Sequence, residues 1–516
     1  MFVIRRMVGD LPRPRLRGGG STKPSALNHI SIVFVSFVLL CAISLSAGSF
    51  LSLGFLFERN YNEGWNVYNT QRLMGHEVVY DSNYWRINNY PIGSFLIVGG
   101  INFLVHDLLI CGRIVALLSL AAIGLLAAMA TRRFGGDRTD AIFGSGCTLG
   151  FCYLVAPAWI MVDDPQTLGE AVMLGGLVSY LTRSPSLLRL LFTALLVVSA
   201  GFIKHNLVAI PLAVTFDLAV RSPRRLLFWV LCCTGFAASF LGVTQIVAGG
   251  SFIDHLLSPR IFTWYGVGYH LKKYLRLFKF PLLAIVLLSP MVFSERRRLL
   301  AVWGIFSIAS AALLSGFEGT SYNMFQDAAV FLGIAAGVTL CELRKHLSAE
   351  GIIRGRFAAI SSVVVTLVLA QPIFARTPDA FWQIYHGRTL LNFDRHAQAA
   401  FMSEAEYIAE RRPAICESML LCYEAGQPFI LDPFNSRQYI LGGKLNQDEL
   451  IRRIAAHEFG VIQLRADICD DPAVAGCHIL HYPQKFNRFT DDTLYAVDHY
   501  YKIGGRSQDG TFYVPK

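Results

Sequence analysis

The feature that most constrains this chain is a series of long apolar segments joined by short polar loops. A helix needs about 20 apolar residues to cross the hydrocarbon of a bilayer. Only 16% of the 516 residues are charged, against roughly 25% in a soluble domain, which excludes a single soluble globule. We therefore predict an α-helical polytopic membrane protein with about eleven transmembrane helices, at 29–57, 112–131, 141–160, 166–182, 187–203, 206–220, 226–248, 280–294, 299–316, 325–341 and 357–375.

Positive charge is concentrated in loops at one end of these segments. Residues 1–375 contain 31 of the 46 Lys and Arg but 18 of the 36 Asp and Glu. When the spans alternate in direction, most of these basic residues fall on one side, in the segment 1–28 and in the loops at 132–138, 183–189, 221–225, 296–298 and 344–356. Cytoplasmic loops are rich in Lys and Arg, so the charge indicates membrane topology and not a nucleic-acid surface. We expect a cytoplasmic segment 1–28 before an uncleaved first span.

One further apolar stretch, 91–109, would break this alternation if it crossed the membrane. We expect it to lie along the outer membrane surface as an interfacial helix. The outer side then holds the loops 58–111, 249–279 and 317–324 and the whole tail 376–516.

The tail differs in composition from the transmembrane domain at 29–375. It contains 15 basic and 18 acidic residues, and short apolar stretches alternate with amphipathic ones, which predicts a small α/β domain outside the membrane. The expected elements are helices near 399–411 and 447–457, strands near 414–417, 428–431 and 460–464, and a closing hairpin near 500–514.

Four of the eleven cysteines lie in this tail. Disulfides form in an oxidising outer compartment, so we expect two local ones, Cys416 with Cys422 and Cys469 with Cys477. Metal binding by the same four residues is the alternative, although neither spacing is of the CxxC kind.

Acidic residues at the outer ends of the spans are the first candidates for chemistry, because ionisable groups at membrane depth are costly and mark function. Glu58 and Glu63 follow the first span, where either carboxylate can serve as general base toward an acceptor hydroxyl. The alternative is an ordinary solvated loop. Asp163 and Asp164 in WIMVDDPQTLGE suit a divalent ion or an acceptor, although Asp164 before a proline also suits a helix cap.

Basic and aromatic residues form a second group of candidates. Lys204 and His205 stand between two apolar segments in GFIKHNLVAIP, where a lysine suits a phosphate or pyrophosphate oxyanion. The alternative is a side chain that extends to lipid head groups. Arg260 lies in a basic and aromatic loop typical of contact with anionic head groups, and Tyr322 and Asn323 lie in the short loop GFEGTSYNMF.

Several common motifs are absent from the sequence. It contains no GxxxxGK[ST] phosphate loop and no GxSxG elbow, and Ala456-His457-Glu458 lacks the second histidine of HExxH. The sequence therefore does not indicate cytosolic nucleotide-driven chemistry. Matching broken helices from inverted repeats, which indicate many secondary transporters, are not found either.

The outer motifs YNEGWNVY, NYPIGSF, DDPQ and FIKHN resemble the GT-C superfamily of integral-membrane glycosyltransferases, in particular the bacterial relatives of the protein mannosyltransferases and of the lipid A aminoarabinose transferase. The resemblance covers roughly residues 30–375. It implies a sugar carried on a polyprenyl phosphate or pyrophosphate, transfer on the outer face, and an acidic residue in the first outer loop. On this resemblance Asn62-Glu63 corresponds to an Asp-Glu pair of many members, Tyr90 to a Tyr-Pro-Pro motif, and Tyr322-Asn323 to a late Tyr-Asn.

The resemblance implies a hexosyl or pentosyl transferase. Lys204, helped by Arg260, would hold the donor phosphate, Glu63 would deprotonate the acceptor hydroxyl, and Asp164 would orient the acceptor or a divalent ion. Asn62, Tyr90, Asp163, His205, Tyr322 and Asn323 would complete the substrate site. The expected partners are a polyprenyl-phosphate sugar, a glycolipid, polysaccharide or protein acceptor and membrane lipids, in the inner membrane with a periplasmic tail. A lipid-linked glycan flippase and an oligosaccharide ligase are the alternatives.

Overall fold

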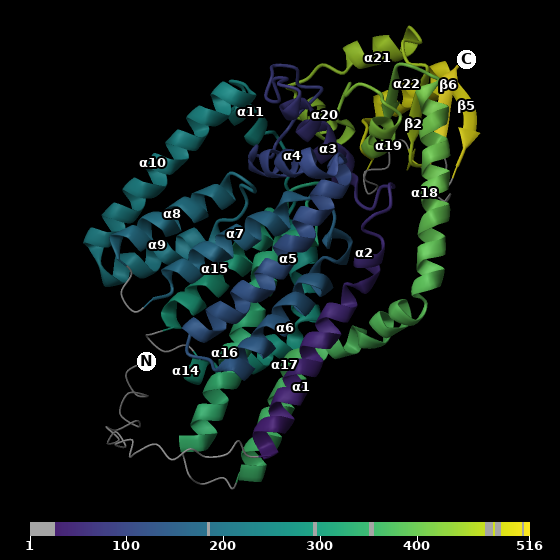
Figure 1. Cartoon of the computed structure of the whole chain (residues 1–516). Coiled ribbons are helices and arrows are strands. Elements are labelled where there is room, and N and C mark those ends of the chain that lie inside the picture. The colour runs from purple at the N-terminus through teal and green to yellow at the C-terminus, as the bar shows by residue number, and fades with distance from the viewer. Residues whose placement is uncertain are drawn as a thin grey trace.

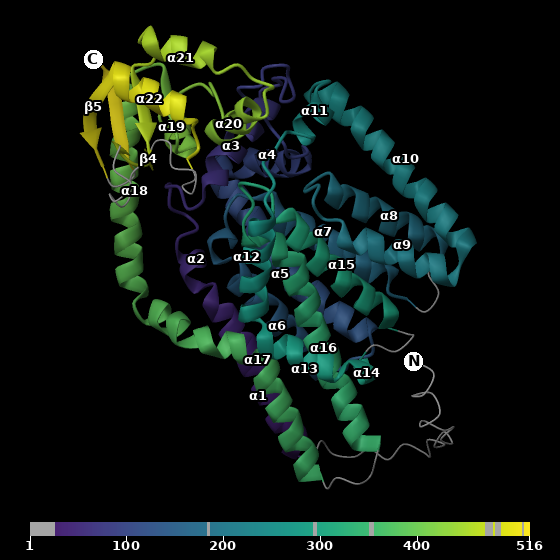
Figure 2. The same ribbon diagram turned by 180° about the vertical axis from the view of Figure 1, so that it is seen from behind.

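The computed structural model describes residues 26–182, 186–292, 297–349, 355–469, 478–479, 487–507 and 510–516. A tall helical bundle carries a smaller region of helices and strands at one pole (Figures 1 and 2). The first half of the bundle contains α1 (Ala26–Leu45), α2 (Ala47–Leu51), α3 (Tyr61–Met74), α4 (Gly93–Val105), α5 (Leu108–Arg133), α6 (Arg138–Val155), the 3-10 helix η2 (Pro157–Trp159), α7 (Pro165–Tyr180), α8 (Leu187–Gly201) and α9 (Ala209–Arg221).

The second half of the chain adds further helices to the same bundle and ends in a helix that extends from the bundle to the sheet. It contains α10 (Pro223–Ala248), α11 (Phe252–Leu256), α12 (Trp264–Leu277), α13 (Lys279–Leu287), α14 (Ser289–Val292), α15 (Arg298–Leu314), η4 (Tyr322–Phe325), α16 (Gln326–Ala349), α17 (Gly355–Tyr385) and α18 (Gly387–Ala409). Helix α18 rises from the bent end of α17 to the sheet at the pole (Figure 1).

Helices α6 and α16 form the centre of the bundle. The most apolar stretch of α16 is 94% buried. A Cβ atom on Gly333 of α16 would lie 2.5 Å from the Cα atom of Thr148 on α6. Small residues let two helix backbones approach this closely, so the run FGSGCTLG in α6 explains why these two helices pack side by side.

Each predicted span contains helix, but the helices differ in length. Four are long and apolar enough to cross a membrane, and four shorter apolar helices accompany them among the described residues. The first predicted span, 29–57, is interrupted between α1 and α2. The exact count of eleven spans therefore stays a prediction. The stretch predicted to lie on the membrane surface contains α4, a separate helix of 13 residues.

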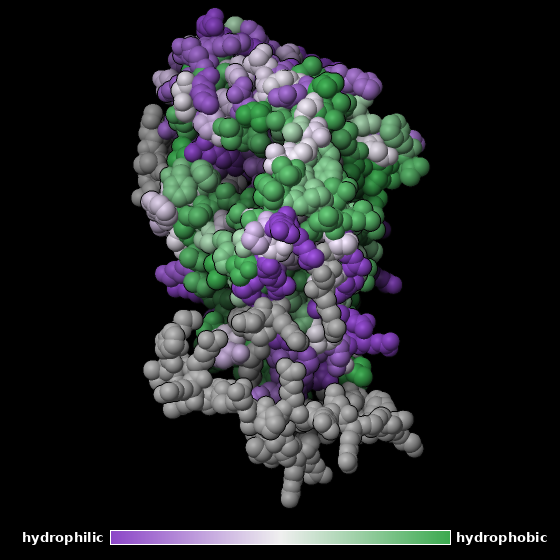
Figure 3. Space-filling view, turned by 90° about the vertical axis from the view of Figure 1, so that its left-hand side faces the viewer, coloured by the Kyte–Doolittle hydropathy of each residue, from purple (hydrophilic) through white to green (hydrophobic). Residues whose placement is uncertain are grey.

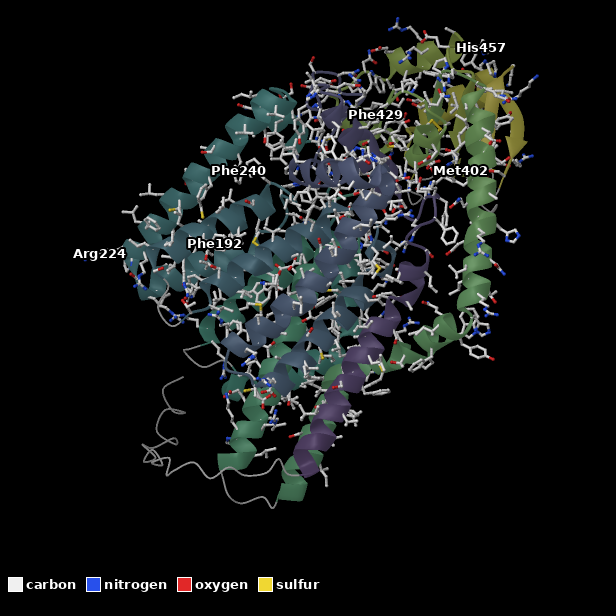
Figure 4. The ribbon with its side chains drawn as sticks, in the orientation of Figure 1. Phe192, Arg224, Phe240, Met402, Phe429 and His457 are labelled. Atoms are coloured by element: carbon white, nitrogen blue, oxygen red, sulfur yellow. A yellow bond between two sulfur atoms is a disulfide. The ribbon has the colours of Figure 1, made fainter. Side chains whose placement is uncertain are left out.

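Apolar side chains cover the middle of the bundle, and polar ones gather at its two ends (Figure 3). On α10, Leu227, Leu231 and Ile246 are 62%, 62% and 86% exposed, and an apolar surface of this kind needs lipid or protein to cover it. Arg224 lies at the start of α10, away from the pole with the sheet, and Phe240 lies further along toward that pole (Figure 4).

The structure brings three of the predicted cytoplasmic loops together at the opposite end. Arg297 donates from Nε to the carbonyl oxygen of Phe134 at 3.1 Å, and Lys345 donates from Nζ to that of Gly135 at 2.9 Å. This clustering of basic residues from distant parts of the chain agrees with the positive-inside pattern of the sequence.

The region at the pole begins after α18 and is called the polar region below. It contains one four-stranded sheet. Its elements are β1 (Ala414–Cys416), α19 (Met419–Glu424), α20 (Pro433–Leu441), α21 (Asp448–Ala455), β2 (Val461–Leu464), α22 (Asp491–Tyr500), β5 (Tyr501–Arg506) and β6 (Thr511–Pro515). The order is β1-β2-β6-β5, with β1 and β2 parallel and the other pairs antiparallel. A short parallel pair joins β3 (Ile468–Cys469) to β4 (His478–Ile479). The segment 428–431, predicted as a strand, has none.

This region packs directly on α3, the first helix after α2. A Cβ atom on Gly64 would lie 2.1 Å from the backbone nitrogen of Leu420, so only glycine allows α19 to approach α3 this closely. Tyr68 donates from its hydroxyl to the carbonyl oxygen of Gln427 at 2.9 Å and stacks on Phe429 with ring centroids 4.9 Å apart. Figure 4 shows Phe429 at this junction.

The disulfide predicted between Cys416 and Cys422 is present. It connects β1 to α19, the helix that contacts α3, and so fixes that helix to the sheet. Cys469 is disulfide-bonded as well, while its predicted partner, Cys477, lies outside the described residues.

Candidate active site

A cavity of about 690 Å³ lies between the bundle and the polar region. Its wall combines the start of α3, the α8–α9 turn, the loop before α12, the loop before η4, and the polar region. The charged and amide side chains along the wall are Arg59, Asn60, Asn62, Asn89, Lys204, His205, Asn206, Arg260, Asn323, Asp432, Asn435, Arg465 and Arg488. The cavity is thus rich in cations and amides, with one carboxylate among its lining residues.

Lys204 is the most deeply buried cation of this cavity. It is 2% exposed, and among the described residues its Nζ has no hydrogen-bond partner. The Oδ1 atom of Asp164 is 3.8 Å away, and the ring centroid of Tyr90 is 3.6 Å away. Burial lowers the pKa of Lys204 to about 8, while Asp164 raises this pKa and Arg260 lowers it. Lys204 is thus a deeply buried lysine whose nearest carboxylate oxygen is 3.8 Å away.

Asp164 links Lys204 to the start of α3. Its Oδ1 accepts from the backbone nitrogen of Gln166 at 2.8 Å, which caps α7. Its Oδ2 accepts from Asn62 Nδ2 at 2.8 Å, and the same Nδ2 donates to the Tyr90 hydroxyl at 3.2 Å. Asp164 therefore forms the predicted helix cap and is also one of the residues predicted for the site. The structure brings four of the predicted site residues together: Asn62, Tyr90, Asp164 and Lys204.

Arg260 enters the same cavity from the loop before α12. Its guanidinium lies 5.3 Å from the ring centroid of Phe434 on α20, and no carboxylate in the described part of the chain forms an ion pair with it. Burial lowers the pKa of Arg260, but an arginine stays protonated at neutral pH. Lys204 and Arg260 thus line one cavity, Lys204 with Asp164 3.8 Å away and Arg260 without an ion-paired carboxylate in the described part of the chain.

Glu63 occupies a different position from the one its predicted role requires. It is fully buried and does not line the cavity. Its Oε1 and Oε2 accept from Arg113 Nε at 2.7 Å and Nη2 at 2.9 Å, and Oε2 also accepts from the backbone nitrogen of Arg59 at 2.8 Å. Both oxygens are thus paired away from the cavity, an arrangement typical of a structural ion pair. The role of Glu63 as general base stays a prediction.

Asp163 also points away from the cavity. Its side chain packs against Gly112 on α5, and burial raises its pKa, with Glu63 and Asp164 raising it further. The adjacent carboxylates of Asp163 and Asp164 therefore diverge and do not provide the predicted site for a divalent ion. The described residues hold no cluster of three or more His, Cys, Asp or Glu that suits a metal.

Glu58 connects the bundle to the polar region. Its carboxylate accepts hydrogen bonds from the Ser418 hydroxyl and from Arg465. Arg488, also on the cavity wall, donates to Glu417 Oε1 at 3.0 Å. The two arginines of the polar region are thus held by carboxylates, and the pairing of Glu58 with Arg465 lowers its suitability as a general base.

The remaining predicted residues divide between two places. His205 and Asn323 line the cavity. Tyr322 does not: it lines a neighbouring cavity, also of about 690 Å³, with the Nζ of Lys273 3.6 Å from its ring centroid. The Tyr-Asn pair of the sequence therefore contributes one residue to each cavity.

Sequence reasoning missed the cavity residues of the polar region and two arginines of the bundle. Arg59 directly follows Glu58 and donates to the carbonyl oxygen of Met161 at 3.0 Å. Arg113 lies in the second turn of the apolar helix α5. An arginine inside an apolar helix is costly unless it is paired, and this signal could have identified Arg113 as the partner of a buried acid.

No model of a known protein family and no curated protein sequence matches the chain. Solved structures do match. ArnT from Cupriavidus metallidurans bound to undecaprenyl phosphate aligns over 95% of this chain and 98% of that one, with a TM-score of 0.57 and 12% identity. The same enzyme in the apo state aligns over the same shares, with a TM-score of 0.58 and 13% identity.

The oligosaccharyltransferase of Archaeoglobus fulgidus, tethered with an acceptor peptide, covers 80% of this chain and 65% of its own length. Its TM-score is 0.50 and its identity 11%. At such identities the likeness is one of fold. The chain has the fold of ArnT and of this oligosaccharyltransferase, which is the kind of fold that the resemblance in the sequence implies.

Proposed function

We propose that this protein is a membrane glycosyltransferase that takes a sugar from a polyprenyl-phosphate donor and transfers it to a lipid, polysaccharide or protein acceptor. One observation carries the proposal. Lys204 and Arg260 line the same cavity, and neither has a carboxylate within hydrogen-bond distance. A buried cation is costly until an anion binds it, so the cavity suits a phosphate group.

The transfer reaction needs two functions from the residues around the cavity: stabilisation of the leaving phosphate and acceptance of the proton from the acceptor hydroxyl. The acceptor oxygen forms a bond to the anomeric carbon of the sugar while the bond from that carbon to the phosphate oxygen breaks. The phosphate leaves with the electron pair, and Lys204 and Arg260 stabilise its charge. The proton of the acceptor hydroxyl passes to a carboxylate, in a single inverting step.

Two carboxylates at the cavity form no ion pair with an arginine among the described residues: Asp432, which lines it and accepts from Tyr61 and Asn435, and Asp164, which contacts the lining residues Asn62 and Lys204. We assign the proton to Asp164, the carboxylate next to Lys204. Its side-chain partners are neutral amides and a lysine 3.8 Å away, whereas Glu63 and Glu58 are paired with arginines. A carboxylate without a close arginine keeps more of its basicity. Asp164 does not itself line the cavity, but Asn62, which donates a hydrogen bond to it, does.

The proposal places this cavity on the outer face of the cell inner membrane, with the polar region periplasmic. The support is the arrangement of charge. The loops of Arg297 and Lys345 meet at the end of the bundle away from the polar region, and basic loops are typical of the cytoplasmic side.

The test is donor turnover by purified protein in lipid nanodiscs. A panel of undecaprenyl-phosphate sugars is mixed with an envelope glycolipid extract, and released undecaprenyl phosphate is measured by mass spectrometry. We expect Lys204→Met and Asp164→Asn each to lower turnover about 100-fold, as loss of a group that acts in the transition state does. Asparagine still caps α7, so the D164N protein should fold.

The matched controls are Lys272→Met, an exposed lysine on α12, and Asp107→Asn, which caps α5 in the same way outside the cavity. Both should keep wild-type turnover. Saturable donor binding without release of undecaprenyl phosphate would instead support the transport alternative, and wild-type turnover in K204M would overturn the assignment of the phosphate site.

A further inference from the structure

Arg488 of the polar region lines the cavity with part of its guanidinium unpaired. The guanidinium carbon lies 4.3 Å from the ring centroid of Tyr61, another residue of the wall. Arg488 Nη1 donates to Glu417 Oε1 at 3.0 Å, and within the described residues the other guanidinium nitrogens have no hydrogen-bond partner. The side chain is 22% exposed. Because a guanidinium has five N–H donors, Arg488 can donate to a bound carboxylate or phosphate while it keeps its bond to Glu417.

Glu417 holds this arginine from behind the cavity wall. It directly follows β1, is 1% exposed and does not line the cavity. Its Oε2 accepts from His478 Nε2 at 2.9 Å and from the backbone nitrogen of Arg465 at 2.8 Å. Its own backbone nitrogen donates to the carbonyl oxygen of Gln463 on β2 at 2.8 Å. The carboxylate is therefore fixed relative to the sheet, and its remaining oxygen fixes the position of Arg488.

Arg488 and Lys204 approach the cavity from different sides of the start of α3. Arg488 lies against Tyr61, whereas Lys204 lies 3.6 Å from the ring centroid of Tyr90. Asn62, the residue after Tyr61, donates to the Tyr90 hydroxyl. Successive side chains of an α-helix point about 100° apart, so Tyr61 and Asn62 diverge. The two cations therefore provide two separate places for an anion.

The carboxylate on the cavity wall does not pair with Arg488. Asp432 accepts from the Tyr61 hydroxyl and from the backbone nitrogen of Asn435, both at 3.1 Å, and so caps α20. No ion pair joins Asp432 to Arg488 in the described part of the chain. The donor brings one phosphate, which the proposed function assigns to Lys204 and its neighbour. Arg488 is thus available to the other substrate, the acceptor.

We infer that Arg488 binds an anionic group of the acceptor, a phosphate or a carboxylate, and that Glu417 is the positioning residue that keeps the guanidinium at the cavity wall. This inference rests on the proposed function and deepens it, since it names the charge of the acceptor and gives the polar region a part in binding it. Charge-assisted hydrogen bonds are about twice as strong as neutral ones, so a neutral acceptor of the same shape should bind less tightly.

The test measures equilibrium binding to the full-length protein in nanodiscs of zwitterionic lipid, saturated with undecaprenyl phosphate so that Lys204 and Arg260 are occupied. The probes share one tail and one sugar ring: dodecyl glucoside, the same glucoside phosphorylated at its primary hydroxyl, and dodecyl glucuronide. We expect at least one of the two anionic probes to bind about tenfold more tightly than the neutral one. Arg488→Met should remove this preference, and Arg488→Lys, which keeps the charge, should retain about threefold.

A second variant tests the positioning. Glu417→Asp keeps the charge but is shorter by one methylene group, so it holds Arg488 less well, and the preference should fall to about threefold. The affinity for undecaprenyl phosphate should stay within about twofold of wild type, which shows that the protein is folded. The matched controls are Glu318→Asp and Arg437→Met. These two residues form a similar pair at 2.9 Å, but neither lines the cavity, so both variants should keep the full preference.

The outcomes separate this inference from the proposed function. Lys204→Met should weaken the binding of undecaprenyl phosphate and leave the preference among the three probes intact. Equal affinity for the three probes, or a preference that survives in R488M, overturns the inference, and an unchanged preference in E417D overturns the positioning role. Loss of undecaprenyl phosphate binding in R488M would place Arg488 at the donor phosphate and not at the acceptor. Wild-type protein that shows the preference but binds no undecaprenyl phosphate would contradict the proposed function alone.

Discussion

Two buried ion pairs lie close together at the end of the bundle that carries the sheet, and they differ in how completely their charged atoms are hydrogen-bonded. In the first, Glu63 and Arg113 are both fully buried and share two hydrogen bonds of 2.7 and 2.9 Å. In the second, Asp164 and Lys204 have side chains only 2% exposed, but the distance between them is 3.8 Å. The lysine nitrogen has no hydrogen-bond partner in the described part of the chain.

The difference separates a structural role from a binding role. Arg113 Nη1 and Nη2 also donate to the carbonyl oxygens of Phe55 and Phe57, at 2.5 and 2.8 Å, so the first pair holds the chain segment between α2 and α3 in place. Such a pair has no capacity left for a substrate. The second pair leaves a desolvated ammonium group unsatisfied, which a bound anion can satisfy.

The largest expected effect concerns the pair Glu63–Arg113, which we call the closed pair because both of its side chains are fully hydrogen-bonded within the protein. Glu63→Gln leaves Arg113 buried without its counter-ion, and breaking a buried pair in this way costs about 3–5 kcal/mol. We expect little folded E63Q protein after extraction and a strongly lowered thermal unfolding midpoint. The molecules that do fold should keep near wild-type turnover, since Glu63 does not touch the cavity.

The matched control is the double variant Glu63→Met, Arg113→Met, which removes both charges and replaces them with apolar side chains. Its unfolding midpoint should lie well above that of E63Q. If E63Q instead folds as well as the wild type and loses only turnover, Glu63 is the base and the comparison between the two pairs is wrong.

The sequence predicted a good part of this arrangement, for physical reasons. Apolar length and basic loops depend only on composition and order, so the place of each apolar helix along the chain could be predicted, although its ends could not. Asp164 and Lys204 were identified because each lies at the end of an apolar segment, where an ionisable side chain is costly and therefore indicates function. Cys416 and Cys422 are close in sequence, so their disulfide needed no knowledge of the tertiary fold.

The rest depends on contacts between distant parts of the chain. Glu63 is held away from the cavity by Arg113, which lies 50 residues beyond it. Asp432 and Asn435 reach the cavity only because α19 and its neighbours pack on α3. Neither contact leaves a periodic pattern in the sequence, which is why the burial of Glu63 against Arg113 was not predicted.

The next effect concerns the pair Asp164–Lys204, which we call the open pair. It is a dependence of donor binding on pH. Because burial lowers the pKa of Lys204 to about 8, the lysine of the empty site loses its proton above that pH. A bound phosphate favours the protonated form and so raises this pKa. The dissociation constant of an undecaprenyl-phosphate hexose, whose diester does not titrate in this range, should therefore stay level below pH 7.5 and rise toward tenfold per pH unit above about 8.5.

Lys204→Arg is the control for this titration. A guanidinium stays charged above pH 12, so its binding should stay level from pH 7 to 9.5 even if the absolute affinity is lower. A wild-type dissociation constant that does not change over this range would show that Lys204 does not carry the binding charge, and the contrast between the open and closed pairs would lose its functional meaning.

The smallest effect concerns the aromatic ring that supports the open pair. The Lys204 Nζ lies 3.6 Å from the ring centroid of Tyr90, and a desolvated cation–π contact is worth about 1–2 kcal/mol. The ring helps to keep the ammonium group charged while no phosphate is bound. Replacing it by an aliphatic side chain should therefore lower the pKa of Lys204 further and weaken phosphate binding at neutral pH, so Tyr90→Leu should raise the dissociation constant about fivefold.

Tyr90→Phe keeps the ring and removes only the hydroxyl, which accepts one hydrogen bond of 3.2 Å from Asn62. Its effect on donor binding should be about twofold or less, because Asn62 keeps its shorter bond to Asp164. The downward shift of the pH midpoint should also appear in the Leu variant and not in the Phe variant. If both variants weaken binding equally, the hydroxyl and not the ring supports the site, and Lys204 is stabilised through Asn62 and Asp164 alone.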